Sequence, residues 1–279
     1  MNSEKIDKIN ELKAHAKNMR ELALEMAYKS GGSAHLGGGL SFIDAAAVLY
    51  GEVMNVKDKA LPYEKKDKFI LSKGHGVLGL YSALAEFGII DKDLLSTFMQ
   101  DGSDLIAHPV MKPELGLEAS SGSLGQGISM AVGMALAAKK KGYSYQTYVV
   151  CGNGECNEGS VWEACMSAVN YKLDNLTIFV DNNHMQSDGV SANIMNVSDK
   201  YVDMFKALGF QTMEIDGNDM EALYDAFMTP HKEGCPKVVV GNTIKGKGVS
   251  FMENNSEWHH NRLIEKQYMA AVEELRSAK

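Results

Sequence analysis

The chain has 279 residues, of which 45% are hydrophobic and 23% charged, a composition typical of a folded globular protein rather than a disordered one. Its 28 Lys and Arg against 36 Asp and Glu give a formal charge of −8, which argues against nucleic acid or an anionic membrane as a main partner. No run approaches the ~18 consecutive apolar residues that a membrane span requires, and the charged start MNSEKIDKINELK contains no secretory signal.

A long amphipathic helix is predicted at residues 5–28. Its apolar side chains recur mostly every three or four residues, at Ile6, Ile9, Leu12, Met19, Leu22 and Met26. The sequence KSGGSAHLGGGLS follows, and its five glycines predict an irregular loop whose backbone can approach a ligand closely.

Four apolar, β-branched runs predict buried strands, at residues 69–71, 147–151, 176–180 and 238–240. Because these runs do not alternate with polar residues, we expect strands that are covered on both faces. Helical patterns lie between them, at 128–141 and 161–171, and a last amphipathic helix is predicted within 261–279. The sequence therefore predicts a single α/β domain over residues 1–279, with a doubly wound, mainly parallel sheet and helices on both faces. The four cysteines form no C-x-x-C pair, so we expect reduced thiols in a cytoplasmic protein.

Two strand ends carry candidate metal and phosphate ligands. One strand runs into VVCGNGECNEGS, where we expect a phosphate to meet the backbone N–H groups of a helix that opens near Ser160. The next strand ends in Asp181-Asn182-Asn183. Side-chain oxygens at adjacent strand ends suit Mg²⁺ or Ca²⁺, with a diphosphate completing the coordination. Each turn taken alone fits an ordinary Gly- and Asn-rich turn better, so the hypothesis depends on their combination.

Histidines occupy four further loops: His35, His75, His108 and the pair His259-His260. An isolated histidine is usually structural, but four loops that each present one favour a common site. Neutral imidazole can donate to a phosphate or a sugar hydroxyl and can transfer protons near neutral pH. The segment SGSLGQG, before the helix at 128–141, fits either a close approach to a ligand or a simple helix entry. For Lys245 and Lys247, the pattern favours solvated surface over a position at the site.

Six segments, in this order, resemble the thiamine diphosphate-binding half of transketolases: SAHLGGGLSFIDAAAVLY, ILSKGHGVLGLYSAL, SSGSLGQGISMAVGMAL, GNGECNEGSVWEA, KLDNLTIFVDNN and KGKGVSFMENNSEWHH. The match runs from about residue 8 to about residue 265 and resembles the split type, in which two chains replace one. The resemblance implies transfer of a two-carbon ketol unit from a ketose phosphate to an aldose phosphate through thiamine diphosphate. It places the chain in carbohydrate metabolism of the pentose phosphate kind.

The resemblance also implies roles for individual residues. The cofactor is expected to contact His75, Ser123, Leu124, Gly125, Gly152, Gly154, Glu155, Asn183 and His259. The side chains of Asn153 and Asn183 and the backbone carbonyl of Met185 match the ligands of Mg²⁺ or Ca²⁺. His35, His108 and His259 match histidines that contact the sugar, and Glu158 matches a glutamate of the network between paired active sites.

Two positions depart from the family pattern. The family's Gly-Asp-Gly is here Gly152-Asn153-Gly154, which replaces a charged metal ligand with a neutral amide oxygen. Asn153 either weakens the binding of metal and cofactor or marks a catalytically impaired homologue. Trp258-His259-His260 replaces the frequent Trp-His-Gly, and the additional imidazole leaves the identity of the substrate open.

The resemblance finally implies a partner. The glutamate that activates the cofactor belongs to the family's pyrimidine-binding domain, which we expect on a C-terminal subunit of about 300 residues. We therefore expect an α2β2 heterotetramer and no turnover by this chain alone. Two alternatives stay open: another thiamine-dependent carboligase or decarboxylase that acts on a 2-oxo acid, and a non-catalytic homologue. The histidines at the substrate positions favour a sugar, and the retention of Glu158 and Asn183 favours an active enzyme.

Overall fold

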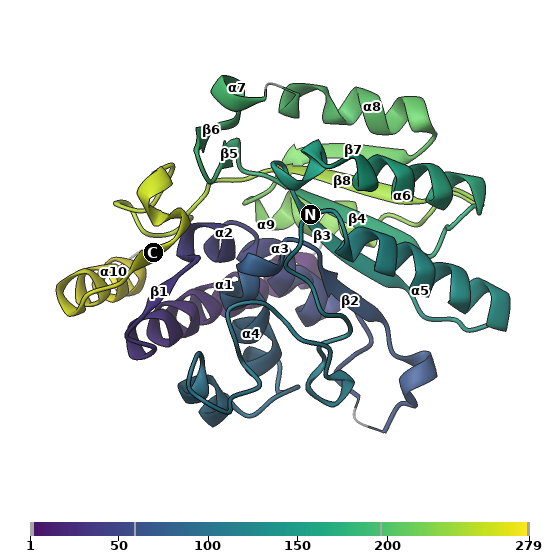
Figure 1. Ribbon diagram of the computed structural model, residues 1–279. Coiled ribbons are helices and arrows are strands. Elements are labelled where there is room, and N and C mark those ends of the chain that lie inside the picture. The colour runs from purple at the N-terminus through teal and green to yellow at the C-terminus, as the bar shows by residue number, and fades with distance from the viewer. Residues whose placement is uncertain (1–2, 59, 196, 278–279) are drawn as a thin grey trace.

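The structure, a computed structural model that describes residues 3–58, 60–195 and 197–277, is built around one five-stranded sheet (Figure 1). All strands of this sheet are parallel, in the order β2-β3-β4-β8-β7. Their bounds are Lys68–Leu71 for β2, Thr147–Gly152 for β3, Leu176–Asn182 for β4, Gln211–Asp216 for β7 and Lys237–Asn242 for β8. The predicted α/β fold with a doubly wound parallel sheet is confirmed.

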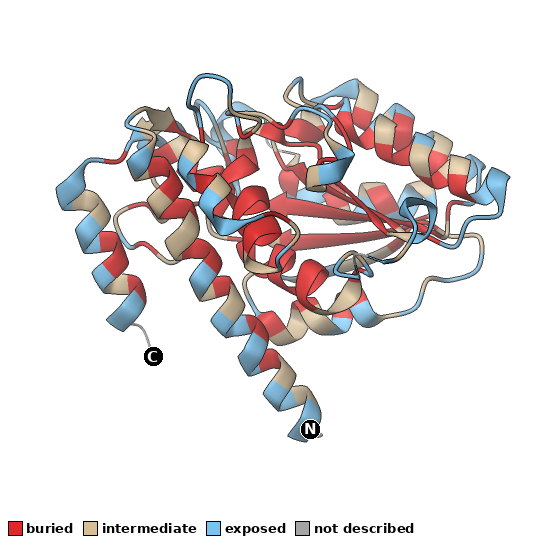
Figure 2. Cartoon of the chain, turned by 90° about the horizontal axis from the view of Figure 1, so that it is seen from below, coloured by how far each residue is buried: buried red, intermediate tan, exposed pale blue. Residues whose placement is uncertain are grey.

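Helices cover both faces of the sheet. One face packs against α1 (Ser3–Lys29), α3 (Ile43–Val48), α4 (Val77–Glu86) and α9 (Met220–Met228), through strand residues such as Phe69, Val150 and Phe179. The other face packs against α5 (Gly127–Lys141), α6 (Gly159–Asn170) and α8 (Tyr201–Leu208), through Ile70, Val149 and Ile178. Successive strand residues point to opposite faces, and both faces are buried (Figure 2). This double burial explains why the strands read as continuous apolar runs.

The predicted helices are present with small shifts at their ends. The helix predicted at 5–28 is α1, that at 128–141 is α5 and that at 161–171 is α6. The last one is α10 (Glu265–Ser277), which begins after a short strand, β9 (Asn261–Arg262). Residues 1–2, at the start of the sequence, and 278–279, at the end of the last predicted helix, lie outside the described residues.

The glycine-rich segment 29–41 differs from the prediction. After β1 (Ser33–Ala34), which pairs with β9, residues Leu36–Leu40 form the short helix α2 instead of an irregular loop. Its glycines are required by close packing: a Cβ on Gly37 would lie 2.9 Å from the Trp258 carbonyl oxygen, and one on Gly39 would lie 3.1 Å from Leu78 Cβ. These close approaches are to the protein's own chain, and the expected close approach to a ligand stays a prediction, with Gly38 of this segment in the pocket lining.

The strand β7 was not predicted. It lies at the edge of the sheet, where half-buried positions alternate with buried and exposed ones, and its sequence QTMEID has no continuous apolar run. A criterion based on double burial therefore cannot detect it. Three further short elements follow β4: β5 (Met185–Gln186), β6 (Gly189–Val190) and α7 (Ser191–Ile194).

Candidate active site

A pocket of about 240 Å³ lies at the carboxyl ends of the parallel strands, where α/β sheets bind ligands. It brings together most of the residues predicted for the site: His35, His75, His108, Leu124, Gly152, Asn153, Gly154, Glu155, Asn183, Met185 and His259. Gly38, Lys73, Gly122, Gln186, Ser187 and Lys245 complete its walls. A larger cavity of about 370 Å³, beside Tyr50 and Glu118, contains none of the predicted site residues.

Three predicted residues do not line this pocket. Ser123 and Glu158 are exposed, while Gly125 is buried and its N–H donates to the Glu155 carboxylate at 2.8 Å. The same carboxylate accepts the Gly152 N–H at 3.1 Å and the Ser72 hydroxyl at 2.5 Å. Burial raises the pKa of Glu155, and these donors oppose that shift. Glu155 thus ties the SGSLGQG segment to the turn after β3.

The turn after β3 differs from the prediction in its relation to α6. A short 3-10 turn, Glu155–Asn157, separates Gly152-Asn153-Gly154 from α6, whose first residue is Gly159. The pocket wall ends at Glu155, and the Ser160 hydroxyl donates to the Gly125 carbonyl at 3.1 Å. The opening of α6 does not line the pocket, and the expectation that it meets a phosphate stays a prediction. Within the described chain the Gly154 N–H donates to no acceptor, so this group is available to a ligand.

Asn153 is held from three directions. Its amide nitrogen donates to Ser191 Oγ at 2.7 Å, its backbone carbonyl accepts the Tyr201 hydroxyl at 2.6 Å, and its N–H donates to the Asp181 carbonyl at 3.1 Å. No described residue donates to its side-chain oxygen Oδ1, which is the end of the amide left for the pocket.

The other two predicted metal ligands lie beside it. Asn183 Oδ1 accepts the Met185 N–H at 3.1 Å and keeps its second lone pair. The Ser191 N–H donates to the His184 carbonyl at 2.9 Å, so the adjacent antiparallel pair Met185 and Val190 is a non-hydrogen-bonded one. The Met185 carbonyl is consequently not used in pairing with β6.

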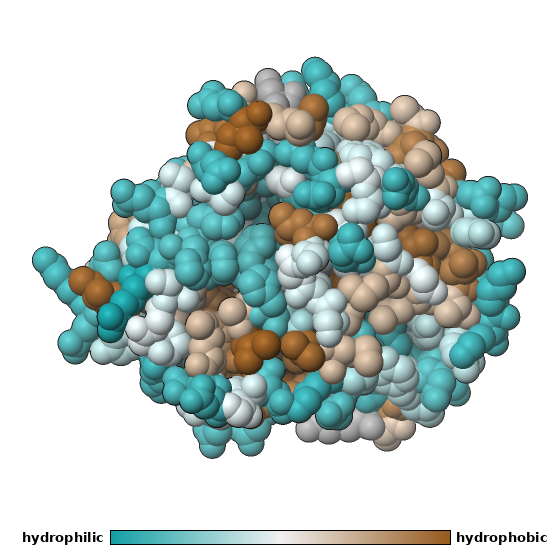
Figure 3. All heavy atoms as spheres, in the orientation of Figure 1, coloured by the Kyte–Doolittle hydropathy of each residue, from teal (hydrophilic) through white to brown (hydrophobic). Residues whose placement is uncertain are grey.

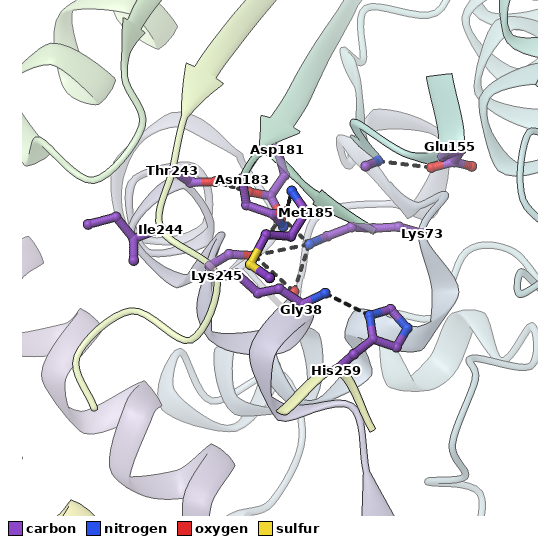
Figure 4. A network of polar contacts seen from close by, with 12 residues as sticks. Gly38, Lys73, Glu155, Asp181, Asn183, Met185, Thr243, Ile244, Lys245 and His259 are labelled. Atoms are coloured by element: carbon purple, nitrogen blue, oxygen red, sulfur yellow. Dashed lines mark hydrogen bonds and ion pairs between the residues drawn. The ribbon is translucent and has the colours of Figure 1, made fainter. Parts of the chain in front are cut away.

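Lys73, in the pocket wall, forms a buried ion pair with Asp181, which does not line the pocket (Figure 4). The Lys73 ammonium also donates to the Gly38 carbonyl at 2.6 Å, and Asp181 also accepts from Ser41 at 2.5 Å and from Thr243. Asp181 is therefore fully engaged with the protein. Of the predicted Asp181-Asn182-Asn183 end, only Asn183 lines the pocket.

Lys245 is the site residue that the sequence pattern favoured least. Its side chain is 2% exposed, and its ammonium lies 2.8 Å from His259 Nδ1 and 3.3 Å from the Gln186 carbonyl (Figure 4). Burial, reinforced by the charge of Lys73, lowers the pKa of Lys245 to about 8. The signal that could have found it is topological, since Lys245 follows β8 at the same sheet edge as the other site turns. Lys247 lies outside the pocket and pairs with Glu253.

The histidine rings form one cluster around His35. Ring centroids lie 5.3 Å from His35 to His75, 5.9 Å to His108, 5.4 Å to His259 and 4.4 Å to the exposed His260. Burial, followed by neighbouring charges, lowers the pKa of His35 to about 3 and that of His259 to about 4, and it also lowers the pKa of His75 and His108. These four imidazoles are therefore neutral at pH 7. Because the Lys245 ammonium donates to Nδ1 of His259, the proton of that ring resides on Nε2.

The described part of the chain offers no group of three or more His, Cys, Asp or Glu side chains that could hold a metal ion. It also has no helix that is long and apolar enough to cross a membrane. On the face shown in Figure 3, hydrophobic residues form separate patches within a largely hydrophilic surface.

These features define a parallel α/β domain with a histidine-rich pocket at its strand ends, which also contains the buried Lys245. The family model for the transketolase thiamine diphosphate-binding domain matches residues 12–276. The chain belongs to the transketolase family, and the matched region is that family's thiamine diphosphate-binding domain. The predicted recognition and the predicted class, a thiamine diphosphate-dependent transferase, are confirmed.

The relatives show a division into subunits. The chain is 39% identical to an apulose-4-phosphate transketolase subunit of Actinobacillus succinogenes, over 96% of both chains. It is 38% identical to the 6-deoxy-6-sulfo-D-fructose transketolase subunit of a Clostridium species, over 99% of this chain and 98% of the relative. By contrast, it spans 43% of human transketolase, at 34% identity. The solved transketolase of Campylobacter jejuni superposes with a TM-score of 0.85 at 30% identity, over 95% of this chain and 42% of the other.

Proposed function

We propose that this chain is the cofactor-binding subunit of a transketolase that transfers a two-carbon ketol unit from a ketose phosphate to an aldose phosphate. One observation carries the proposal. Four neutral imidazoles and a buried lysine, Lys245, face the Asn153 and Asn183 strand ends in a single pocket, and no described carboxylate pairs with this lysine. Such a set of donors suits a polyanionic cofactor together with a polyhydroxylated substrate.

The pocket fits the diphosphate of thiamine diphosphate. Lys245 supplies positive charge, His259 presents its Nε2–H, and the Gly154 N–H is free to donate. We propose that His75 joins them, and that Leu124 packs against the cofactor rings. Gly152 leaves room at the pocket wall, since a Cβ there would come no closer than 3.5 Å to any neighbour. Glu155 holds this wall to the adjacent segment by accepting the N–H groups of Gly125 and Gly152, and contacts of Ser123 and Gly125 with the cofactor stay predictions.

We propose that Asn153, Asn183 and the Met185 carbonyl hold Mg²⁺ or Ca²⁺ at the same place. All three ligands are neutral oxygens, and hard cations accept such ligands. The protein therefore contributes no anionic ligand of its own, and most of the attraction for the metal must come from the diphosphate. Metal binding is accordingly expected to depend on the cofactor.

When bound, thiamine diphosphate supplies the nucleophilic carbon and the electron sink for cleaving a carbon–carbon bond beside a carbonyl. The chain's residues orient the sugar and move protons. His35 and His108, neutral at pH 7, can accept or donate at substrate hydroxyls. The exposed His260, beside His35, extends this imidazole surface to the pocket mouth.

We propose that the pyrimidine-binding domain resides on a separate C-terminal subunit, in an α2β2 assembly. Three relatives matched over nearly their full length are named as transketolase subunits, and the chain spans only about two fifths of solved transketolases. Glu158, exposed and outside the pocket, is a candidate for the network between paired sites. A cytoplasmic location stays a prediction.

The test combines this chain with a pyrimidine-domain subunit from the same organism. Thiamine diphosphate, Mg²⁺, a ketose phosphate donor and an aldose phosphate acceptor are added, and the elongated ketose is identified by mass spectrometry. We expect product with both subunits and none with either alone. Carbon dioxide released from pyruvate without ketol transfer would establish the 2-oxo acid alternative, and turnover by this chain alone would overturn the divided site.

The impaired-homologue alternative depends on Asn153. The names of two relatives contain sugars, which favours an active sugar enzyme over a 2-oxo acid one. We expect the assembled wild-type protein to bind Mg²⁺ with its cofactor, and Asn153→Asp to bind it about tenfold more tightly. Cofactor and metal binding that is absent in the wild type and restored by Asn153→Asp would instead establish the impaired homologue.

A further inference from the structure

Ser191 is the residue on which the orientation of the Asn153 amide depends. It is the first residue of α7, it is 1% exposed, and its hydroxyl oxygen accepts the Asn153 amide N–H at 2.7 Å. The segment that carries it returns over the turn after β3, and Tyr201, farther along the chain, donates to the Asn153 backbone carbonyl. Ser191 therefore acts on the side chain of Asn153 and Tyr201 on its backbone.

An amide ligand has a requirement that a carboxylate ligand lacks. The two oxygens of a carboxylate are equivalent, whereas only one end of an asparagine amide can bind a cation. If Oδ1 faces the metal, the NH₂ group must point back into the protein. Asn153 is 2% exposed, so an NH₂ group without an acceptor there would remain buried and unsatisfied, which is unfavourable.

We propose that Ser191 is a positioning residue that turns the Asn153 amide oxygen toward the divalent cation. This inference rests on the proposed function, since it concerns the metal of that site. Ser191 Oγ is the acceptor that satisfies the amide NH₂ on the side away from the pocket. By accepting from the NH₂ group, the serine hydroxyl fixes the orientation of the amide. The amide oxygen can then bind the cation at a position where the family has a carboxylate.

The experiment is a double-mutant cycle on the complex of this chain with its partner subunit. Calorimetry measures the dissociation constant of Mg²⁺ at saturating thiamine diphosphate. We expect Ser191→Ala to weaken Mg²⁺ binding about tenfold, as loss of the acceptor for a buried donor predicts. In the Asn153→Ala background, Ser191→Ala should cause no further loss, because its effect passes through the amide.

Two additional variants separate positioning from folding. Ser198→Ala removes another buried serine of the same segment, which is not among the described hydrogen-bond partners of Asn153, and we expect unchanged Mg²⁺ affinity. Ser191→Cys keeps a side chain of similar size with a weaker acceptor, so an intermediate loss is expected even if Ser191→Ala folds poorly.

The outcomes distinguish the two proposals. Wild-type binding of metal and cofactor with no effect of Ser191→Ala or Ser191→Cys overturns the inference and leaves the proposed function intact. An equal loss from Ser191→Ala with and without Asn153 also overturns it, because the role would then be general. Failure of the assembled wild type to bind the cofactor overturns the proposed function, and the inference with it.

Discussion

Two buried lysines at the same sheet edge, Lys73 and Lys245, differ in the partners of their ammonium groups. Lys73 pairs with Asp181, donates to a backbone carbonyl and lies 4.6 Å from the centre of the Phe42 ring. Lys245 contacts no carboxylate in the described chain, and its described partners are His259 Nδ1 and the Gln186 carbonyl. A buried charge needs a counterion or enough hydrogen-bond acceptors. Lys73 lines the pocket but has its counterion within the protein, whereas Lys245 lacks a counterion that a diphosphate can provide.

A third buried lysine shows that a shifted pKa does not by itself indicate a site. Burial lowers the pKa of Lys237 to about 8, the same value as for Lys245. Yet the Lys237 ammonium donates to three carbonyls at the end of α9: those of Ala226, Phe227 and Thr229. Such a position satisfies the carbonyls that a helix leaves free at its C-terminus. The distinction lies in the partners and not in the pKa.

The largest effect is expected for Lys73→Met. It leaves Asp181 buried without its counterion, and the free energy of unfolding should fall by about 3 to 5 kcal/mol. Urea denaturation followed by circular dichroism measures the change. Adding Asp181→Asn to Lys73→Met removes the orphaned charge and should recover part of the loss. An unchanged unfolding midpoint in Lys73→Met would show that the pair does not stabilise the fold.

Lys245→Met should affect cofactor affinity rather than stability. The variant loses no carboxylate partner, so its unfolding free energy should be unchanged or slightly higher. Its affinity for thiamine diphosphate should fall about 10- to 100-fold, because a charged hydrogen bond to the diphosphate is lost. Calorimetric titration measures the affinity. Lys247→Met is the matched control: it removes a lysine two positions away, outside the pocket, and should bind normally. Equal affinities for the two variants would place Lys245 in the scaffold.

The contrast between scaffold and site residues also explains what the sequence could predict. The doubly wound sheet was predictable because burial on both faces leaves continuous apolar runs in β3, β4 and β8. The convergence of Asn153 with Asn183 followed from the rule that parallel strands end at one edge, and that of the histidines was inferred from four loops that each present one. The edge strand β7 has no such run and was missed.

The pairing of buried side chains could not be predicted from the sequence. Lys73 and Asp181 are 108 positions apart, and nothing local indicates that one neutralises the other. Lys245 has the same pattern in the sequence as Lys247, although one is buried in the pocket and the other pairs with Glu253 outside it. The bond from Asn153 to Ser191 likewise depends on how the segment after β4 returns over the pocket. Sequence patterns indicate the fold and the place of the pocket, whereas tertiary contacts decide which buried charges have a partner.

The pH dependence of cofactor binding tests the charge on Lys245. Its pKa is about 8 in the free pocket, so the ammonium is present below pH 8 and is lost as the pH rises above it. Phosphate groups are already ionised in this range. We expect the affinity for thiamine diphosphate to fall above pH 8, by at most about tenfold per pH unit. The decline should be absent in Lys245→Met, and an equal decline in both proteins would assign it to another group.

The smallest expected effect is the loss of stability at acidic pH that two buried histidines cause, one in the pocket and one outside it. Burial lowers the pKa of both His259, in the pocket, and His231, which bonds Thr177 outside it, to about 4. Unfolding restores an ordinary pKa of about 6.5, so the unfolded state binds more protons, and stability is lost as the pH falls from 6.5 toward 4. Each histidine should contribute less than about 1 kcal/mol near pH 5.5, after allowance for solvent screening.

Thiamine diphosphate should distinguish the contribution of His259 to acid sensitivity from that of His231. An anion beside His259 stabilises the imidazolium, so the cofactor should reduce the acid sensitivity that comes from this ring, whereas His231 is out of its reach. The measurement is the unfolding free energy between pH 4.5 and about 7, with and without cofactor. In His231→Gln the protection by cofactor should persist, and in His259→Gln it should diminish. Equal protection in both variants would mean that His259 does not face the diphosphate, and Lys245, its neighbour at 2.8 Å, would then have to bind that anion without it.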